Sequence, residues 1–210
     1  MKQELLPITP NTPGDAVPRR GHRLLAGLGR LILRLMGWRI VGELPNIDRA
    51  VLAVAPHTSN IDGVIGLSAI QALRIHVKFM GKHTLFEGRL GRLMYWLGGI
   101  PVNRDNAQDL VEQTAAAMQA EPSWLGIAPE GTRKGADRWK TGFYPIAEAQ
   151  GIPVIVLGFC YRRRQVRVVG TVMPSGDMEA DLALMVHMLA DIVPRHPERL
   201  SGPFLHRERS

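Results

Sequence analysis

The sequence has one cysteine, few aromatic residues and no long uninterrupted apolar run among its 210 residues. Because Cys160 is alone, neither a disulfide framework nor a cysteine-only zinc site can form. Arg or Lys interrupts each apolar run before the roughly 18 residues that a membrane-spanning helix needs. The first 18 residues are polar, carry four prolines and lack an apolar centre, which predicts a flexible polar tail over residues 1–18, no secretory signal and a cytoplasmic location.

Basic residues outnumber acidic ones. The chain has 26 Lys plus Arg against 19 Asp plus Glu, a formal net charge of +7. Such a surplus predicts an anionic partner: a nucleic acid, a membrane surface, a phosphorylated substrate or an acidic carrier protein. Aromatic residues make up only 6% of the chain, so side chains for stacking on bases are scarce and nucleic acid is the weakest of these candidates.

The pattern of residues 19–43 predicts a basic amphipathic helix with a lead-in strand. At about 100° per residue, Arg23, Arg30 and Arg34 share one face. The opposite face is apolar and carries Leu25, Leu28, Ile32 and Met36. Two interpretations stay open, because such a helix can lie in a membrane interface or dock on the core of its own protein.

Residues 44–210 show short apolar runs alternating with helical patterns, which predicts one α/β domain. The expected strands are Val51–Ala55, Val77–Met80, Ile100–Val102, Trp124–Ala128 and Val154–Phe159, with helices at Ile61–Leu73, Leu85–Leu97, Ala107–Ala120 and Phe143–Ala149. A hairpin over Arg162–Gln165 and a closing helix over Asp177–Val193 complete the pattern, before a polar, charged tail. We expect a largely parallel, twisted sheet flanked by helices, with the ligand beyond the carboxyl ends of the strands.

A histidine and an aspartate follow the first predicted strand of this domain. Thr58, Ser59 and Asn60 are all capable helix N-caps. His57 should therefore precede a helix and Asp62 should lie in its first turn, close enough to orient the imidazole. His57 would then act as a general base. The alternative is an ordinary helix start with an incidental histidine. Gly66–Ile70 lacks the last glycine of a nucleophile elbow, so the reacting hydroxyl would come from the substrate.

Each later strand of the expected parallel set also ends in polar or basic residues. They are Lys82 and His83 after the second strand, Arg104 after the third, and Glu130, Gly131, Thr132 and Arg133 after the fourth. Because carboxyl ends of parallel strands meet at one edge, these residues predict a cationic pocket for a phosphate. Each basic residue taken singly has the simpler interpretation of a solvated loop charge, and Glu130 could instead bond the amides of its own turn.

In these motifs and their order, the chain resembles the glycerolipid acyltransferase family, typified by 1-acyl-glycerol-3-phosphate acyltransferase. His57 and Asp62 match its first motif, and Pro129–Arg133 its third. Gly99–Arg104 and Gly151–Val154 resemble the second and fourth, so the likeness covers about Val51–Phe159. Trp139–Gly142 is similar to a segment that follows the third motif in many members.

The resemblance implies a glycerol-phosphate acyltransferase-like fold. It also implies acyl transfer from an acyl-CoA or acyl-carrier protein to a glycerolipid hydroxyl, with no metal, cofactor or covalent enzyme intermediate. 1-Acyl-glycerol-3-phosphate is the first acceptor expected, giving phosphatidate in phospholipid biosynthesis on the cytoplasmic face of a membrane. His57 would be the base and Asp62 its orienter. The acceptor site would comprise Lys82, His83, Arg104, Glu130, Gly131, Thr132 and Arg133, and backbone amides near His57 would stabilise the oxyanion.

Departures from the family pattern keep the acceptor open. Asn103 stands where many members have Asp, Lys134 replaces a common Ser, and Val156 replaces a Pro that often follows the fourth motif. Another lysophospholipid or an aminolipid is therefore an alternative acceptor. Two further rivals are a non-catalytic binder of anionic lipid and an esterase, although the sequence offers no convincing nucleophile for the latter.

Overall fold

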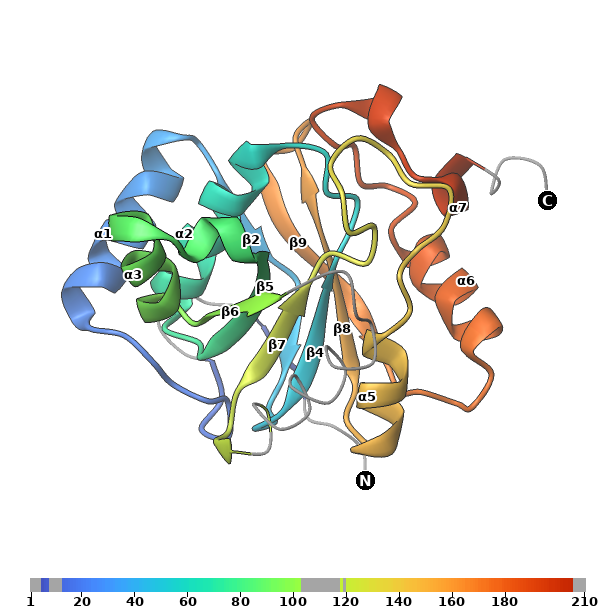
Figure 1. Ribbon diagram of the computed structural model, residues 1–210, viewed down its shortest axis with the longest axis horizontal. Coiled ribbons are helices and arrows are strands. Elements are labelled where there is room, and N and C mark those ends of the chain that lie inside the picture. Colours follow the sequence, from blue (N-terminus) through green and yellow to red (C-terminus); the bar gives the residue numbers. More distant parts are fainter. Residues whose placement is uncertain (1–4, 8–12, 103–117, 119, 206–210) are drawn as a thin grey trace.

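The computed structural model describes residues 5–7, 13–102, 118 and 120–205, which form a mixed α/β fold (Figure 1). The strands are β1 (Leu5–Pro7), β2 (Arg39–Val41), β3 (Glu43–Pro45), β4 (Ala50–Val54), β5 (Val77–Lys82), β6 (Gly99–Val102), β7 (Trp124–Ile127), β8 (Val154–Cys160) and β9 (Gln165–Val172). The helices are α1 (Arg23–Leu35), α2 (Asn60–Leu73), α3 (Gly88–Trp96), α5 (Phe143–Ala149), α6 (Met178–Met188) and α7 (Gly202–Leu205), with short 3₁₀ helices η1 (His83–Phe86) and η2 (Pro197–Arg199).

Seven of the strands form one sheet in the order β2-β9-β8-β4-β7-β5-β6. Every pairing from β8 through β4, β7 and β5 to β6 is parallel, whereas β9 runs antiparallel to β8 and pairs in parallel with β2. The prediction of a largely parallel sheet is confirmed. All five strands expected for it are present within two residues of their predicted ends, and residues 161–164 form the expected hairpin between β8 and β9.

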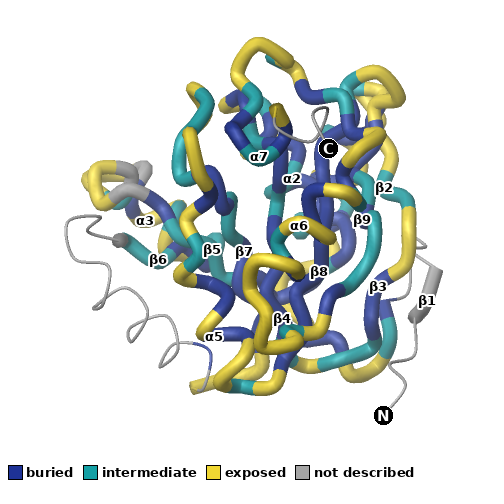
Figure 2. The backbone as a smooth tube through the Cα atoms, turned by 90° about the vertical axis from the view of Figure 1, so that its right-hand side faces the viewer, coloured by how far each residue is buried: buried dark blue, intermediate teal, exposed yellow. Residues whose placement is uncertain are grey.

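The sheet separates two hydrophobic cores, because successive residues of a strand point to opposite faces. Along the wholly buried strand β8, Val154 and Val156 face the core that contains α5 and α6. Ile155 and Leu157, which alternate with them, face the core that contains α1 and α2. Figure 1 shows the two helical layers on either side of the sheet, and Figure 2 shows that β4 and β8 consist largely of buried residues, coloured dark blue.

Helix α1 packs closely on α2 through small residues. Its buried positions are Ala26, Gly29 and Leu33. A Cβ added to Gly29 would lie only 2.5 Å from the carbonyl oxygen of Ser68 in α2, so the two backbones nearly touch. Of the apolar face expected from the sequence, Leu28 is 51% exposed, so the docking face of α1 is a different one.

Three segments differ from the sequence prediction. Residues 13–18 are packed rather than flexible: Val17 is buried among apolar side chains and the Pro18 carbonyl accepts a hydrogen bond from the His76 amide. The helix expected from Leu85 starts only at Gly88, after the 3₁₀ turn η1. The closing helix α6 stops at Met188, five residues before its predicted end. The helix predicted over Ala107–Ala120 lies outside the described residues, apart from residues 118 and 120.

Candidate active site

Three neighbouring strands bring the site together at one edge of the sheet. Strand β4 lies between β8 and β7 and is parallel to both. The residues that follow the three carboxyl ends are His57 after β4, Glu130 after β7 and Tyr161 after β8. This is the edge at which ligands bind in open parallel sheets.

The imidazole of His57 is hydrogen bonded to Asp62, as the sequence predicts. Its Nδ1 atom lies 3.0 Å from Oδ2 of Asp62, a side chain that is 1% exposed. A carboxylate can only accept, so Nδ1 carries the proton and Nε2 keeps its lone pair. The His57 side chain remains 17% exposed, which leaves the ring open to a ligand.

Asp62 serves two purposes at once. Its Oδ2 atom also accepts from the backbone amides of Thr58 and Ser59 at 3.0 and 2.9 Å, and Ser59 completes a capping box at the start of α2. The same residues therefore form a helix start and pair the histidine with a carboxylate, so the two interpretations of this motif do not exclude each other. Burial alone would raise the pKa of Asp62, but hydrogen bonds from His57, Tyr161 and Ser59 outweigh burial and hold the pKa below its ordinary value.

Glu130 holds the other side of the His57 backbone. The side chain is buried, its Oε2 atom accepts from the His57 amide at 2.6 Å, and its Oε1 atom accepts from the Ser201 hydroxyl at 3.3 Å. The bond to His57 reaches across to another loop, not to the turn of Glu130 itself. Burial is the main reason that the pKa of Glu130 rises to about 7, against the opposing effect of these hydrogen bonds.

Four backbone amides around His57, the segment expected to stabilise the oxyanion, already have acceptors within the protein. The His57 amide donates to Glu130, and the Thr58 and Ser59 amides donate to Asp62. The Ile61 amide donates to the Ser59 hydroxyl. These amides hold the site together, because buried carboxylates and helix caps need donors.

The rest of the third motif forms a turn beside Glu130. Gly131 has φ +64°, a left-handed conformation that favours glycine, and a Cβ there would lie 2.9 Å from the flexible Lys140 side chain. The Thr132 hydroxyl accepts from the Lys134 amide, and Arg133 is exposed. The structure thus adds Lys140, for which the sequence analysis proposed no role, to the cations near this turn.

The other predicted acceptor residues are placed less completely. Lys82 ends strand β5, whose partners are β7 and β6, and its side chain lies outside what the structure describes. His83 is exposed at the start of η1. Arg104 lies outside the described residues. Across the ranges that the structure does describe, no group of three or more His, Cys, Asp or Glu residues is arranged to hold a metal.

The segment after α6 lies against the active-site loop rather than forming a plain charged tail. The His196 amide donates to the Thr58 hydroxyl at 3.2 Å, and the buried Ser201 accepts from the Trp139 indole while donating to Glu130. No sequence motif marks Ser201. Tyr161, in contrast, directly follows a strand, as the other candidate residues do. It was not predicted because the three arginines after it give the hairpin the pattern of a solvated, charged turn.

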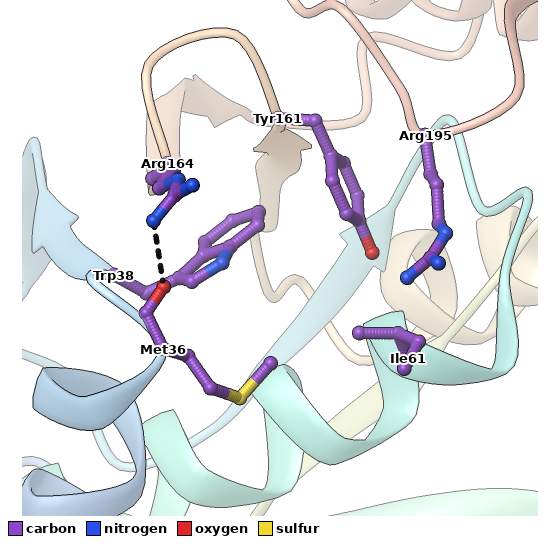
Figure 3. A pocket seen from close by; sticks show the side chains of 6 residues that line it. All are labelled: Met36, Trp38, Ile61, Tyr161, Arg164 and Arg195. Carbon is purple, nitrogen blue, oxygen red and sulfur yellow. Dashed lines mark hydrogen bonds between the residues drawn. The ribbon is translucent and has the colours of Figure 1, made fainter.

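A pocket of about 390 Å³ opens beside this edge. It is lined by Met36, Trp38, Ile61, Tyr161, Arg164 and Arg195. Figure 3 shows the Tyr161 hydroxyl and the Arg195 guanidinium above Ile61, at the start of α2, with Arg164 bonded to the Met36 carbonyl. The pocket therefore has an apolar lining with two cationic side chains.

Comparison with known proteins identifies the family. A family model described as Acyltransferase matches residues 39–159, more than half of the chain, and this range contains His57, Asp62 and Glu130. The chain belongs to the Acyltransferase family. The match confirms the resemblance drawn from the sequence motifs and the prediction of an O-acyltransferase. No curated protein matches the chain.

The fold of this acyltransferase is similar to a solved structure of the 1-acyl-sn-glycerophosphate (LPA) acyltransferase PlsC from Thermotoga maritima. The two chains are 17% identical, with a TM-score of 0.54 over 90% of this chain and 80% of that chain. The predicted glycerol-phosphate acyltransferase-like fold is therefore confirmed.

Proposed function

We propose that this acyltransferase moves an acyl chain from an acyl-CoA or acyl-carrier protein to a hydroxyl of 1-acyl-glycerol-3-phosphate, giving phosphatidate. The observation that carries the proposal is the hydrogen bond from His57 Nδ1 to Asp62 at the carboxyl edge of the sheet. It leaves Nε2 of a partly exposed imidazole as the proton acceptor in a family that transfers acyl groups.

In this mechanism His57 Nε2 takes the proton of the acceptor hydroxyl as its oxygen attacks the thioester carbonyl. The tetrahedral intermediate collapses by breaking the carbon–sulfur bond, and His57 gives the proton to the leaving sulfur, which departs as the free thiol. The buried Asp62 carboxylate stabilises the imidazolium that forms between the two steps. Glu130 fixes the His57 backbone, so both parts of this residue are held by carboxylates.

We assign the acceptor phosphate to the basic residues around the same edge. Arg133 is exposed on the turn after Glu130, and the Lys140 side chain crosses Gly131 in the same turn. Lys82, His83 and Arg104 complete the proposed acceptor site with Glu130, Gly131 and Thr132. Arginine and lysine donate charge-assisted hydrogen bonds to phosphate oxygens, each worth about 1.5 to 3 kcal/mol.

A peripheral position on the cytoplasmic face of a membrane would bring the enzyme to its lipid. Helix α1 carries an outer apolar stripe opposite its docking face, made of Leu24, Leu28, Leu31 and Leu35, which are 51–79% exposed. At about 100° per residue these four side chains fall within an arc of about 60°. Arg23 and Arg34 lie beside the stripe and would face anionic headgroups.

The described helices include none that is long and apolar enough to cross a bilayer. We place the stripe on α1 in the interface because its leucines would face the acyl chains and its arginines the phosphates.

The proposed function is tested by incubating purified protein with palmitoyl-CoA, with and without 1-acyl-glycerol-3-phosphate, and measuring released thiol and lipid products. We expect thiol release that depends on the acceptor and an equal amount of phosphatidate. Free palmitate instead of phosphatidate would make the protein an esterase. Turnover only with a different lysophospholipid or an aminolipid would make that lipid the acceptor. No turnover with any of these acceptors, from either acyl-CoA or acyl-carrier protein, would favour a non-catalytic lipid binder.

Replacing Arg133 by alanine tests the acceptor site. Loss of one charge-assisted bond to phosphate should raise KM for the acceptor about 10- to 100-fold and change kcat much less. Arg163→Ala is the matched control, because Arg163 is also exposed, lies on the β8–β9 hairpin and is assigned no role in the acceptor site. An unchanged KM in Arg133→Ala would remove Arg133 from the acceptor site.

A further inference from the structure

Tyr161 occupies a position that neither the sequence motifs nor the family match assigns. Its hydroxyl donates to Oδ1 of Asp62 at 2.5 Å, while the His57 ring and two backbone amides all bind Oδ2. Tyr161 is thus the donor that holds the second carboxylate oxygen. The two residues are 99 positions apart in the chain.

The Tyr161 ring is itself firmly held. Its backbone amide donates to the Val193 carbonyl, and its ring meets the Trp38 ring edge to face at 4.9 Å between centroids. The Arg195 guanidinium lies 6.0 Å from the Tyr161 ring centroid, on the pocket side (Figure 3). A phenol fixed on three sides can impose a direction on the carboxylate that it binds.

We propose that Tyr161 is a positioning residue for acyl transfer, which fixes the Asp62 carboxylate in the plane that aligns the His57 imidazole. This role rests on the proposed function, in which His57 is the base. Without the phenol, Asp62 keeps three donors on one oxygen and none of the named contacts on the other, so the carboxylate can rotate and the imidazole follows it. The hydrogen bond from the Tyr161 hydroxyl also stabilises the negative charge on Asp62.

The second effect gives a signature in the pH profile. The groups that face Asp62 are His57, Tyr161 and Glu130, with Arg195 beside the phenol. Burial and the bond to Asp62 both raise the pKa of Tyr161, so the phenol stays a neutral donor across the working range. Removing this donor leaves more negative charge on Asp62, which makes the His57–Asp62 pair bind a proton more tightly.

The test is Tyr161→Phe, which removes only the hydroxyl. We expect kcat to fall roughly 5- to 30-fold and the low-pH limb of kcat/KM to move up by about 0.5 to 1 pH unit, with KM for the acceptor nearly unchanged. Tyr144→Phe is the matched control, because the Tyr144 hydroxyl donates to Asp181 at 2.6 Å in the same way but on the other face of the sheet. This control should lose stability and keep the pH profile of the wild type.

The outcomes separate this inference from the proposed function. If His57→Ala has no activity while Tyr161→Phe has the rate and pH profile of the wild type, the positioning role is wrong and the base stands. If folded His57→Ala is fully active, the mechanism fails and the Tyr161 role fails with it. If both tyrosine variants lose the same activity and neither limb moves, Tyr161 is merely structural and the inference is overturned.

Discussion

Glu130 is the residue whose charge state most directly links the site to the stability of the fold. Its carboxyl is almost fully buried, and its pKa is raised from 4.5 to about 7 by burial. The folded protein therefore binds this proton more tightly than the unfolded chain does. Well below pH 4.5 the Glu130 carboxyl is protonated in both states and does not change the stability of the fold. Stability then falls as the pH rises through about 7.

We predict that Glu130→Gln flattens this dependence. Glutamine keeps an oxygen for the His57 amide and carries no charge, so the variant should lose less stability than the wild type between pH 5 and pH 8. The difference should be on the order of 3 kcal/mol at most, since one pKa unit corresponds to about 1.4 kcal/mol. Urea unfolding at both pH values measures it, with the exposed Glu148→Gln as the control. Equal slopes in all three proteins would contradict the assignment.

At the scale of elements, the close approach of α1 to α2 is tightest at Gly29. A Cβ on Gly29 would meet backbone atoms of Ser68 and Ala72 at 2.5 and 2.9 Å, whereas one on Gly27 would meet nothing within 4 Å. Gly29→Ala should cost about 1 to 3 kcal/mol in unfolding free energy through overpacking. Gly27→Ala should stabilise the protein by about 0.5 to 1 kcal/mol through helix propensity. Urea denaturation compares the two, and equal stabilities would show that α1 does not pack on α2 at this distance.

The outer stripe of the same helix predicts membrane binding. In sedimentation with anionic vesicles, the double variant Leu28→Glu, Leu31→Glu should bind at least about tenfold more weakly, because it places two charges in the apolar layer. Leu184→Glu is the control, since Leu184 is 48% exposed on α6, on the other side of the sheet (Figure 1). Vesicle binding by the double variant equal to that of the control would exclude α1 as the membrane contact.

For the whole molecule, the alternation of strand and helix patterns predicted the parallel sheet, and strand-end chemistry predicted the His57–Asp62 pair, because these patterns and this pair are local in sequence. The His57–Asp62 bond spans five positions, a spacing that a capped helix start fixes. Ser201, bonded to Glu130 from 71 positions away, could not be predicted, because only the completed fold brings it to this edge. Both carboxylates around His57 thus depend on contacts with residues that are distant in sequence, Asp62 on Tyr161 and Glu130 on Ser201.

The central claim is that His57 is the base for acyl transfer, and His57→Ala tests it most directly. The measurement is acceptor-dependent thiol release from palmitoyl-CoA by wild type and variant, each checked for its fold by circular dichroism and thermal unfolding. We predict that the folded variant is slower by at least about 100-fold, the lower end of what a general base contributes. A folded His57→Ala protein that releases thiol and forms phosphatidate at the wild-type rate would contradict the account.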